Sequence, residues 1–191
     1  MRLLLVMLLL ITACGTRTGV AQAANAGEIS HGSLKTAYGT SFQILTAGNA
    51  DAPLAVLLVP GKWGLDAELQ AWLPALAGQG VRVVAMDLFD GRPVRNEYMA
   101  NDVWHSVDPV WITADLDGAV ADMSRSAKNI VVMGWDDSLP FVQDSLARHQ
   151  DEIQGLVAVG RQVSVDVPLL LLNKADLSAV TSVQQFLGRW Q

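Results

Sequence analysis

Five short apolar runs recur along the chain, and they constrain its fold more than any other feature of the sequence. The runs are rich in Val, Leu, Ile and Ala, and they cover residues 54–59, 81–86, 130–133, 156–159 and 167–172. Continuous apolar runs of this length are typical of strands that are buried on both faces of a sheet. Such a sheet needs a layer of helices on each face, which leaves few alternatives for the fold.

The stretches between these runs have the spacing of amphipathic helices. They cover residues 66–77, 112–123, 138–149 and 179–190. In the first of them, Leu69, Leu73 and Leu76 fall on one face. Earlier in the chain, residues 34–45 predict one or two edge strands around a turn at Gly39. The alternation of strands and helices predicts an α/β fold with a mostly parallel, doubly wound sheet and right-handed crossovers.

The length and the charge of the chain exclude some classes of protein. With 191 residues, 51% of them hydrophobic and 17% charged, the chain is long enough for one well-buried domain. The formal net charge is -6, the isoelectric point is near 4.9, and the Lys and Arg residues form no basic stripe. We therefore expect no nucleic-acid partner, because phosphate binding depends on clustered positive charge.

The N-terminus has the pattern of an export signal that ends in a lipid attachment site. The apolar stretch at residues 3–11 is too short to span a bilayer whose hydrocarbon core is roughly 30 Å thick. The motif Ile-Thr-Ala-Cys, which ends at Cys14, resembles the lipobox of bacterial lipoproteins, whose cysteine becomes diacylated. This hypothesis makes residues 1–13 a signal peptide and Cys14 the lipidation site and membrane anchor. The alternative is an ordinary signal that is cleaved after Ala23 or Ala26.

The same hypothesis predicts where the protein is found and how it is divided. We expect it at the bacterial cell envelope, lipid-anchored and facing the periplasm or the exterior. Residues 14–33 lack periodicity and are interpreted as a tether, in which His31 is solvated, and residues 34–191 are interpreted as a single folded domain. Because Cys14 is the only cysteine, the domain has no thiol nucleophile, disulfide or thiolate metal site, and we expect no cofactor and no metal.

Four short motifs lie at the ends of the predicted strands and helices. They are an aromatic-Gly-Leu loop at Trp63-Gly64-Leu65, an Ala-Gly-x-Gly helix end at residues 77–80, an Asp-Leu-Phe with a following Gly-Arg in residues 87–92, and a Gly-aromatic-Asp sequence at residues 134–136. Their order and spacing over roughly residues 52–176 resemble the dienelactone hydrolase family of α/β-hydrolases. This resemblance implies an α/β-hydrolase-like domain whose site lies at the carboxyl ends of the strands.

The resemblance also implies roles for two aspartates. The family's nucleophile, a cysteine, matches Asp136, and its catalytic acid matches Asp176. The family's histidine lies on a later loop, and no histidine follows His149 in this sequence. The fold is therefore expected to be truncated at its C-terminus, and the catalytic triad to be incomplete. A second departure precedes the aromatic-Gly-Leu loop, where the family has His-Glu and this chain has Pro60-Gly61.

His105 is the histidine that could replace the missing base. We place it in the segment between a strand end and the next helix, where a loop can cover the carboxyl edge of the sheet. The alternative is a histidine packed against Trp104 or Trp111. His149 is expected at the surface, because one helix separates it from Asp136 by roughly 16 Å.

Asp136 itself has two interpretations. As a nucleophile it would form an ester, which needs a histidine-activated water for its hydrolysis. The simpler interpretation is that Asp136 and Asp137 stabilise the start of the following helix, where carboxylates cap free N–H groups and favour the helix dipole.

Four further side chains are candidates for contact with a substrate: Lys62, Trp63, Arg92 and Trp135. Lys62 could place a cation over the pocket or could be solvated. Arg92 could bind a carboxylate through its guanidinium group or could pair with Asp90. Trp63 and Trp135 indicate a pocket for an aromatic ligand, although core packing explains each of them equally well.

Three functions agree with these observations. The first is a catalytically degenerate hydrolase-like domain at the envelope that binds a small-molecule ligand. The second is an active hydrolase of small esters, lactones or halides that uses Asp136 as its nucleophile. The third is an interaction lipoprotein that presents its domain to an envelope protein partner. The first is the prediction of the sequence, and the third is compatible with it.

Replacing the anchor residue tests the predicted lipidation. In cells supplied with a fatty-acid analogue, the wild-type chain should become labelled and Cys14→Ala should lose the label completely, because no other cysteine can carry a thioether-linked lipid. In-gel detection of the analogue measures the effect. Label that persists in Cys14→Ala would refute the assignment.

Overall fold

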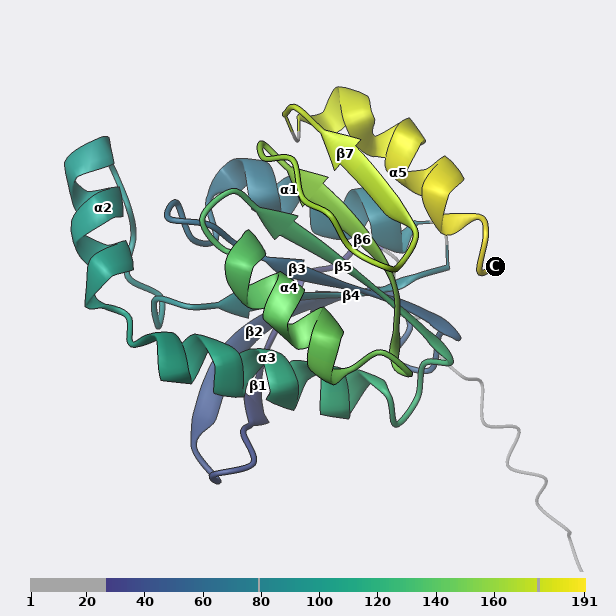
Figure 1. Cartoon of the computed structure of the whole chain (residues 1–191), viewed down its shortest axis with the longest axis horizontal. Coiled ribbons are helices and arrows are strands. Elements are labelled where there is room, and N and C mark those ends of the chain that lie inside the picture. The colour runs from purple at the N-terminus through teal and green to yellow at the C-terminus, as the bar shows by residue number, and fades with distance from the viewer. Residues whose placement is uncertain (1–26, 79, 175) are drawn as a thin grey trace, which may run out of the picture.

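A mixed sheet of seven strands runs through the centre of the molecule in the order β1-β2-β4-β3-β5-β6-β7 (Figure 1). The computed structural model describes residues 27–78, 80–174 and 176–191. The strands are β1 (Ser30–Lys35), β2 (Ser41–Ala47), β3 (Leu54–Val59), β4 (Arg82–Asp87), β5 (Asn129–Trp135), β6 (Ile153–Val159) and β7 (Leu169–Leu172). Strands β4, β3, β5, β6 and β7 are parallel, whereas β1 and β2 are antiparallel to their neighbours. The predicted α/β fold with a mostly parallel sheet is confirmed.

Helices cover both faces of this sheet. They are α1 (Ala67–Ala77), α2 (Glu97–Ser106), α3 (Pro109–Met123), α4 (Leu139–Arg148) and α5 (Val180–Leu187), with a short 3-10 helix, η1 (Leu177–Ala179), before α5. Residues of α1 and α5 share one apolar core with the sheet, and residues of α3 and α4 share another with its opposite face. Helix α2 stands apart from the sheet in Figure 1 and buries only Ala100.

The two cores explain why the five apolar runs form the centre of the sheet. Every residue of β3 is buried, since this strand lies between β4 and β5 and has a helix layer on each face. Trp72 of α1 is fully buried on one face and Met123 of α3 on the other. Each fully buried large apolar side chain contributes roughly 1.5–3 kcal/mol to the free energy of unfolding. The sheet is therefore a rigid support for the loops at its ends.

Two segments differ from the sequence prediction. Strand β1 begins at Ser30, so residues 30–33, which were expected in the tether, belong to the sheet and pair with β2. His31 lies in this strand and is exposed. Residues 97–106, with His105, were expected to be a loop and form helix α2, which begins where the Asn96 side chain accepts a hydrogen bond from the Met99 N–H. Helix α2 was missed although Ala100, Val103 and Trp104 have the spacing of one helix face, because this apolar stripe is short and the other residues of the segment are mostly polar.

The predicted signal peptide, Cys14 and most of the predicted tether lie outside the described residues. Among the described residues, no helix is long and apolar enough to cross a membrane.

Candidate functional site

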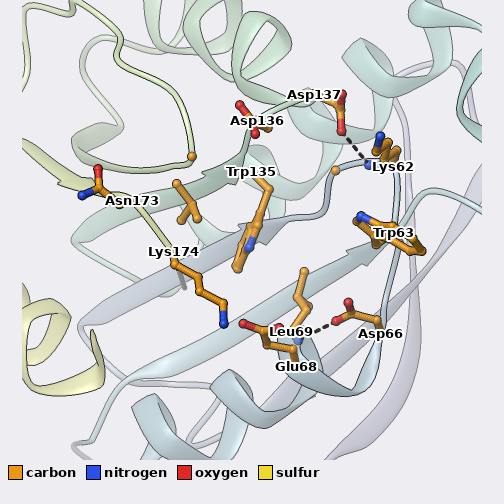
Figure 2. Close-up of a pocket in the computed structure, with 14 residues that line it drawn as sticks. Lys62, Trp63, Asp66, Glu68, Leu69, Trp135, Asp136, Asp137, Asn173 and Lys174 are labelled. Carbon is orange, nitrogen blue, oxygen red and sulfur yellow. Dashed lines mark hydrogen bonds between the residues drawn. The ribbon is translucent and has the colours of Figure 1, made fainter. Parts of the chain in front are cut away.

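A cleft opens at the carboxyl ends of β3, β5, β6 and β7, which is where parallel sheets carry their sites. Its volume is about 250 Å³. Figure 2 shows the residues that line it, which come from the loop after β3, the start of α1, the turn after β5, and the ends of β6 and β7. The cleft therefore gathers residues that are far apart in the sequence.

Asp136 follows directly after β5 at this edge. Its backbone N–H donates to the Val159 carbonyl at 3.0 Å and so continues the pairing of β5 with β6. Its side chain is 56% exposed, and its nearest charged partner among the described residues is Arg161, at 3.6 Å. In Figure 2 the Asp136 carboxylate points away from the ring of Trp135, which reaches into the cleft.

The backbone at Asp136 is relaxed. A hydrolase nucleophile sits on a sharp and strained turn that holds its side chain up at the sheet edge. Among the described residues, the only non-glycine residue with a positive φ angle is Asp90, at 52°. The turn after β5 therefore has the position of a nucleophile turn without its backbone strain.

Ser138 holds this turn in place. Its hydroxyl is fully buried and lies 3.0 Å from the Val59 carbonyl and 2.7 Å from the Trp135 carbonyl, and it accepts a hydrogen bond from the Trp135 N–H at 3.1 Å. One side chain thus connects the ends of β3 and β5 to the start of α4. Nothing in the sequence marks this role, because serine is a common residue at a helix start.

Asp137 occupies the place where a hydrolase would stabilise an oxyanion. In that arrangement two backbone N–H groups point at the substrate oxygen, one from the residue after the nucleophile and one from the loop after β3. Here the Asp137 carboxylate accepts the Lys62 N–H from that loop at 3.2 Å, as the dashed line in Figure 2 shows. Gly61 makes room for this contact, since a side chain there would meet the same carboxylate oxygen. A negative charge fixed at this N–H opposes the binding of an oxyanion.

Comparisons with known proteins agree with this architecture. No family model and no curated protein matches the sequence, but many solved structures match the fold. An esterase of Pyrococcus furiosus is 13% identical with a TM-score of 0.58, and the match covers 87% of this chain and 94% of the esterase. A Klebsiella pneumoniae protein assigned as a dienelactone hydrolase is 18% identical with a TM-score of 0.56, and the match covers 85% of this chain and 81% of that protein.

The fold is that of the α/β-hydrolases. Epoxide hydrolase A of Mycobacterium thermoresistibile is also similar, at 24% identity and a TM-score of 0.53, with 69% of this chain covered. The match spans only 39% of that epoxide hydrolase. Identities this low establish the fold alone, so the chemistry of this domain has to be argued from its own residues.

The ammonium group of Lys62 is paired with residues of helix α2 and is not a free solvated cation. Its ammonium group forms an ion pair with Glu97 and donates to Asn101 Oδ1 at 3.3 Å, and 24% of its side chain is exposed. The hydrogen bond to Glu97 raises the pKa of Lys62, and the negative charges of Asp137 and Asp136 act in the same direction. Lys62 therefore ties the loop after β3 to helix α2.

The tryptophans and a second lysine form the open part of the cleft. Trp135 is half-buried and Trp63 is 42% exposed, and both line the cavity. In Figure 2, Lys174 and Glu68 point toward the same part of the cleft from opposite sides. Neither residue was predicted to line the site. Glu68 has the pattern of an exposed residue at a helix start, and Lys174 that of an exposed residue after a strand. The lining of the cleft thus combines two indole rings with two lysines and four carboxylates, and Lys174 and Glu68 are the charged pair that points into its open part.

Three of the sequence candidates lie elsewhere. Asp176 caps η1, where hydrogen bonds from the Ser178 hydroxyl and N–H lower its pKa, and it is not among the lining residues. His105 lies on α2 with its Nδ1 at 2.6 Å from the Asn101 carbonyl. Arg92 donates from Nε to the Phe89 carbonyl at 3.0 Å and lines a separate depression with Asp87 and Asp90.

His149 is also engaged away from the cleft. Its Nε2 lies 3.0 Å from Asp117, a residue of α3. The expectation that His149 does not serve Asp136 agrees with this contact. Among the described residues, neither His105 nor His149 has a hydrogen bond to Asp136.

Gly160 and Arg161 are the residues near Asp136 that sequence reasoning missed. Gly160 has a φ of 85°, and a Cβ atom on it would lie 2.7 Å from a carboxylate oxygen of Asp136. Only glycine leaves space for that carboxylate in this conformation. The signal was present as a Gly-Arg pair directly after the fourth apolar run.

A pair of buried serines tests the role of the turn. Ser138→Ala should lower the free energy of unfolding by about 2 kcal/mol, because it leaves buried backbone groups of Val59 and Trp135 without a partner. Ser145 is the matched control, since its buried hydroxyl has no hydrogen-bond partner within the described part of the chain. Ser145→Ala should leave stability unchanged or raise it. Urea denaturation measures both, and equal losses would contradict the assigned role of Ser138.

Proposed function

We propose that this α/β-hydrolase-fold domain is catalytically degenerate and that its strand-end cleft binds a small aromatic ligand without converting it. The observation that carries the proposal is the hydrogen bond from the Lys62 N–H to the Asp137 carboxylate at 3.2 Å. Acyl transfer develops a negative charge on the substrate oxygen, and its stabilisation by preorganised N–H donors is usually the largest catalytic contribution. Here the Asp137 carboxylate occupies one of these donors, the Lys62 N–H, in the place where the substrate oxygen would bind.

The surroundings of Asp136 support the same conclusion. A nucleophilic carboxylate needs a histidine-activated water to release its ester. His105 and His149 are engaged elsewhere, and His31 lies on the edge strand β1, which the sheet order separates from β5. The charge of Asp136 is balanced instead by Arg161. In Figure 2 the Asp136 carboxylate points away from the ring of Trp135.

The remaining features of the cleft favour binding. Its volume of about 250 Å³ suits a small molecule. Trp63 and Trp135 offer flat apolar surfaces for an aromatic ring. Glu68 and Lys174, whose ammonium group also lies 3.9 Å from an Asp176 carboxylate oxygen, offer one negative and one positive partner for polar substituents of the ring. We further propose that the domain performs this role at the bacterial envelope, held there through Cys14.

Replacing one tryptophan at a time tests ligand binding. With a panel of aryl lactones and aromatic acids as probes, Trp63→Ala should weaken binding by at least roughly fivefold, because it removes one wall of the cleft. Trp111→Ala is the matched control, since Trp111 is exposed to a similar degree, 44% against 42%, and lines a different depression. Equilibrium dialysis measures the affinity. Equal effects of the two substitutions, or no binding of any probe, would contradict the proposed ligand site.

Turnover measurements test the proposed loss of catalysis. The purified chain should hydrolyse short aryl esters and lactones no faster than Asp136→Ala, because it lacks a competent oxyanion site. A rate that Asp136→Ala abolishes would contradict the proposal and favour the alternative, an active hydrolase with Asp136 as its nucleophile. Intact-mass analysis after incubation with a reactive haloalkane provides an independent readout, since that alternative requires a covalent adduct on Asp136.

A further inference from the structure

Strand β7 forms one edge of the sheet, and its outer side is open. It pairs in parallel with β6 through Leu156↔Leu169 to Val159↔Leu172, and it is the last strand in the sheet order (Figure 1). Within the described parts of the chain, no strand lies on its other side. The outward backbone groups of β7 are therefore available to another strand.

The hydrogen bonds to β6 show which groups face outward. The Pro168 carbonyl accepts from the Leu156 N–H at 2.9 Å, and the Leu172 carbonyl accepts from the Gly160 N–H at 2.8 Å. In a parallel ladder, alternate residues direct both their N–H and their C=O to the same neighbour. Leu169 and Leu171 consequently direct their N–H and C=O groups away from β6.

Strand β7 is short and follows Pro168, but within the strand itself no charge, proline or bulge protects this edge. Natural edge strands avoid pairing with other chains by carrying charges, proline or bulges. Strand β7 consists of four leucines, and Leu171 is 45% exposed. The opposite edge, β1, carries polar residues and Lys35. The two edges of one sheet thus differ sharply, and only β7 presents an uncharged apolar strand.

We propose that β7 pairs antiparallel with β7 of a second copy of this chain, so that the two sheets become continuous across a twofold axis at Leu170. In this register Leu169 lies opposite the partner's Leu171, and Leu171 opposite the partner's Leu169. Both are outward-facing positions, so each pair exchanges two backbone hydrogen bonds. The exposed side chain of Leu171 becomes covered by the partner's Leu169.

Charge complementarity favours a second copy in this register. Asp166 and Lys174 flank β7 at equal distances in sequence from Leu170, and both are exposed. An antiparallel twofold arrangement therefore brings the end of each β7 that carries Asp166 to the end of the partner's β7 that carries Lys174. Lys174 also lines the cleft, so the second copy adds a carboxylate at the rim of each binding site. This inference does not depend on the proposed ligand or on the loss of catalysis.

Disulfide trapping tests the register. In the full chain carrying Cys14→Ala, which removes the only cysteine, Leu170→Cys places two thiols opposite each other on the axis, with Cα atoms roughly 4.5 Å apart. Mild oxidation should convert most of this variant to a covalent dimer on a non-reducing gel. Leu171→Cys is the control: it is more exposed than the half-buried Leu170, but its Cα atoms would be roughly 8 Å apart across the axis. Cross-linking of Leu171→Cys that equals or exceeds that of Leu170→Cys would overturn the proposal.

Charge reversal provides a test that leaves β7 intact. Asp166→Lys and Lys174→Asp should each weaken the dimer by roughly tenfold, because each converts two symmetry-related attractions into repulsions. The double variant should restore the wild-type dissociation constant, measured by sedimentation equilibrium of the full chain carrying Cys14→Ala. A monomer at all concentrations, or a double variant no tighter than the single ones, would overturn the proposal and favour a strand from another protein as the occupant.

Discussion

The hydrogen bond between the Ser138 hydroxyl and the Val59 carbonyl determines the geometry on which the cleft depends. It joins the end of the most buried strand to the start of α4, and the same hydroxyl also contacts both backbone groups of Trp135. The ring of Trp135 and the carboxylates of Asp136 and Asp137 take their directions from this turn. A small buried hydroxyl at this position therefore sets which side chain enters the cleft and which points away.

The consequence is an α/β-hydrolase scaffold whose polar groups satisfy one another. Asp137 accepts the Lys62 N–H, Lys62 pairs with Glu97 of α2, and Arg161 lies beside Asp136. An active site needs strained or unpaired groups that a substrate can engage, and such groups reduce stability. Internal pairing of the same groups favours a stable domain with a preformed cleft. Burial of apolar residues thus determines the fold, whereas the polar residues at the strand ends determine the chemistry of the site.

Internal pairing also gives α2 a role that its burial does not suggest. This helix buries only Ala100 and stands apart from the sheet, yet Glu97 and Asn101 both contact the Lys62 ammonium group. The loop after β3, which carries Trp63, is thereby held by α2 through the Lys62 ammonium group and by Asp137 through the Lys62 backbone N–H. Helix α2 is itself held by apolar contacts, since the ring of Trp104 packs edge-on against Phe89 and Phe141.

The sequence by itself determined the layers of this protein. The five apolar runs form strands, because a strand that is buried on both faces is apolar at every position. The four amphipathic stretches form helices, because a helix that is buried on one face has apolar residues three or four positions apart. It also placed Lys62, Trp63, Trp135 and Asp136 at one edge of the sheet, since the carboxyl ends of parallel strands meet there. The start of β1 and helix α2 were not predicted, since β1 is mostly polar and the apolar face of α2, formed by Ala100, Val103 and Trp104, is short.

Only the tertiary structure decided what these residues do. The contacts of Lys62 with Asp137 and Glu97 join positions 75 and 35 residues apart, and no local pattern encodes such pairs. Asp176 was matched to a catalytic acid by its place after a late strand, and the structure shows it capping a short helix through Ser178. Sequence periodicity reports which side of an element is buried, whereas the direction of a polar side chain depends on the partners that folding brings near it.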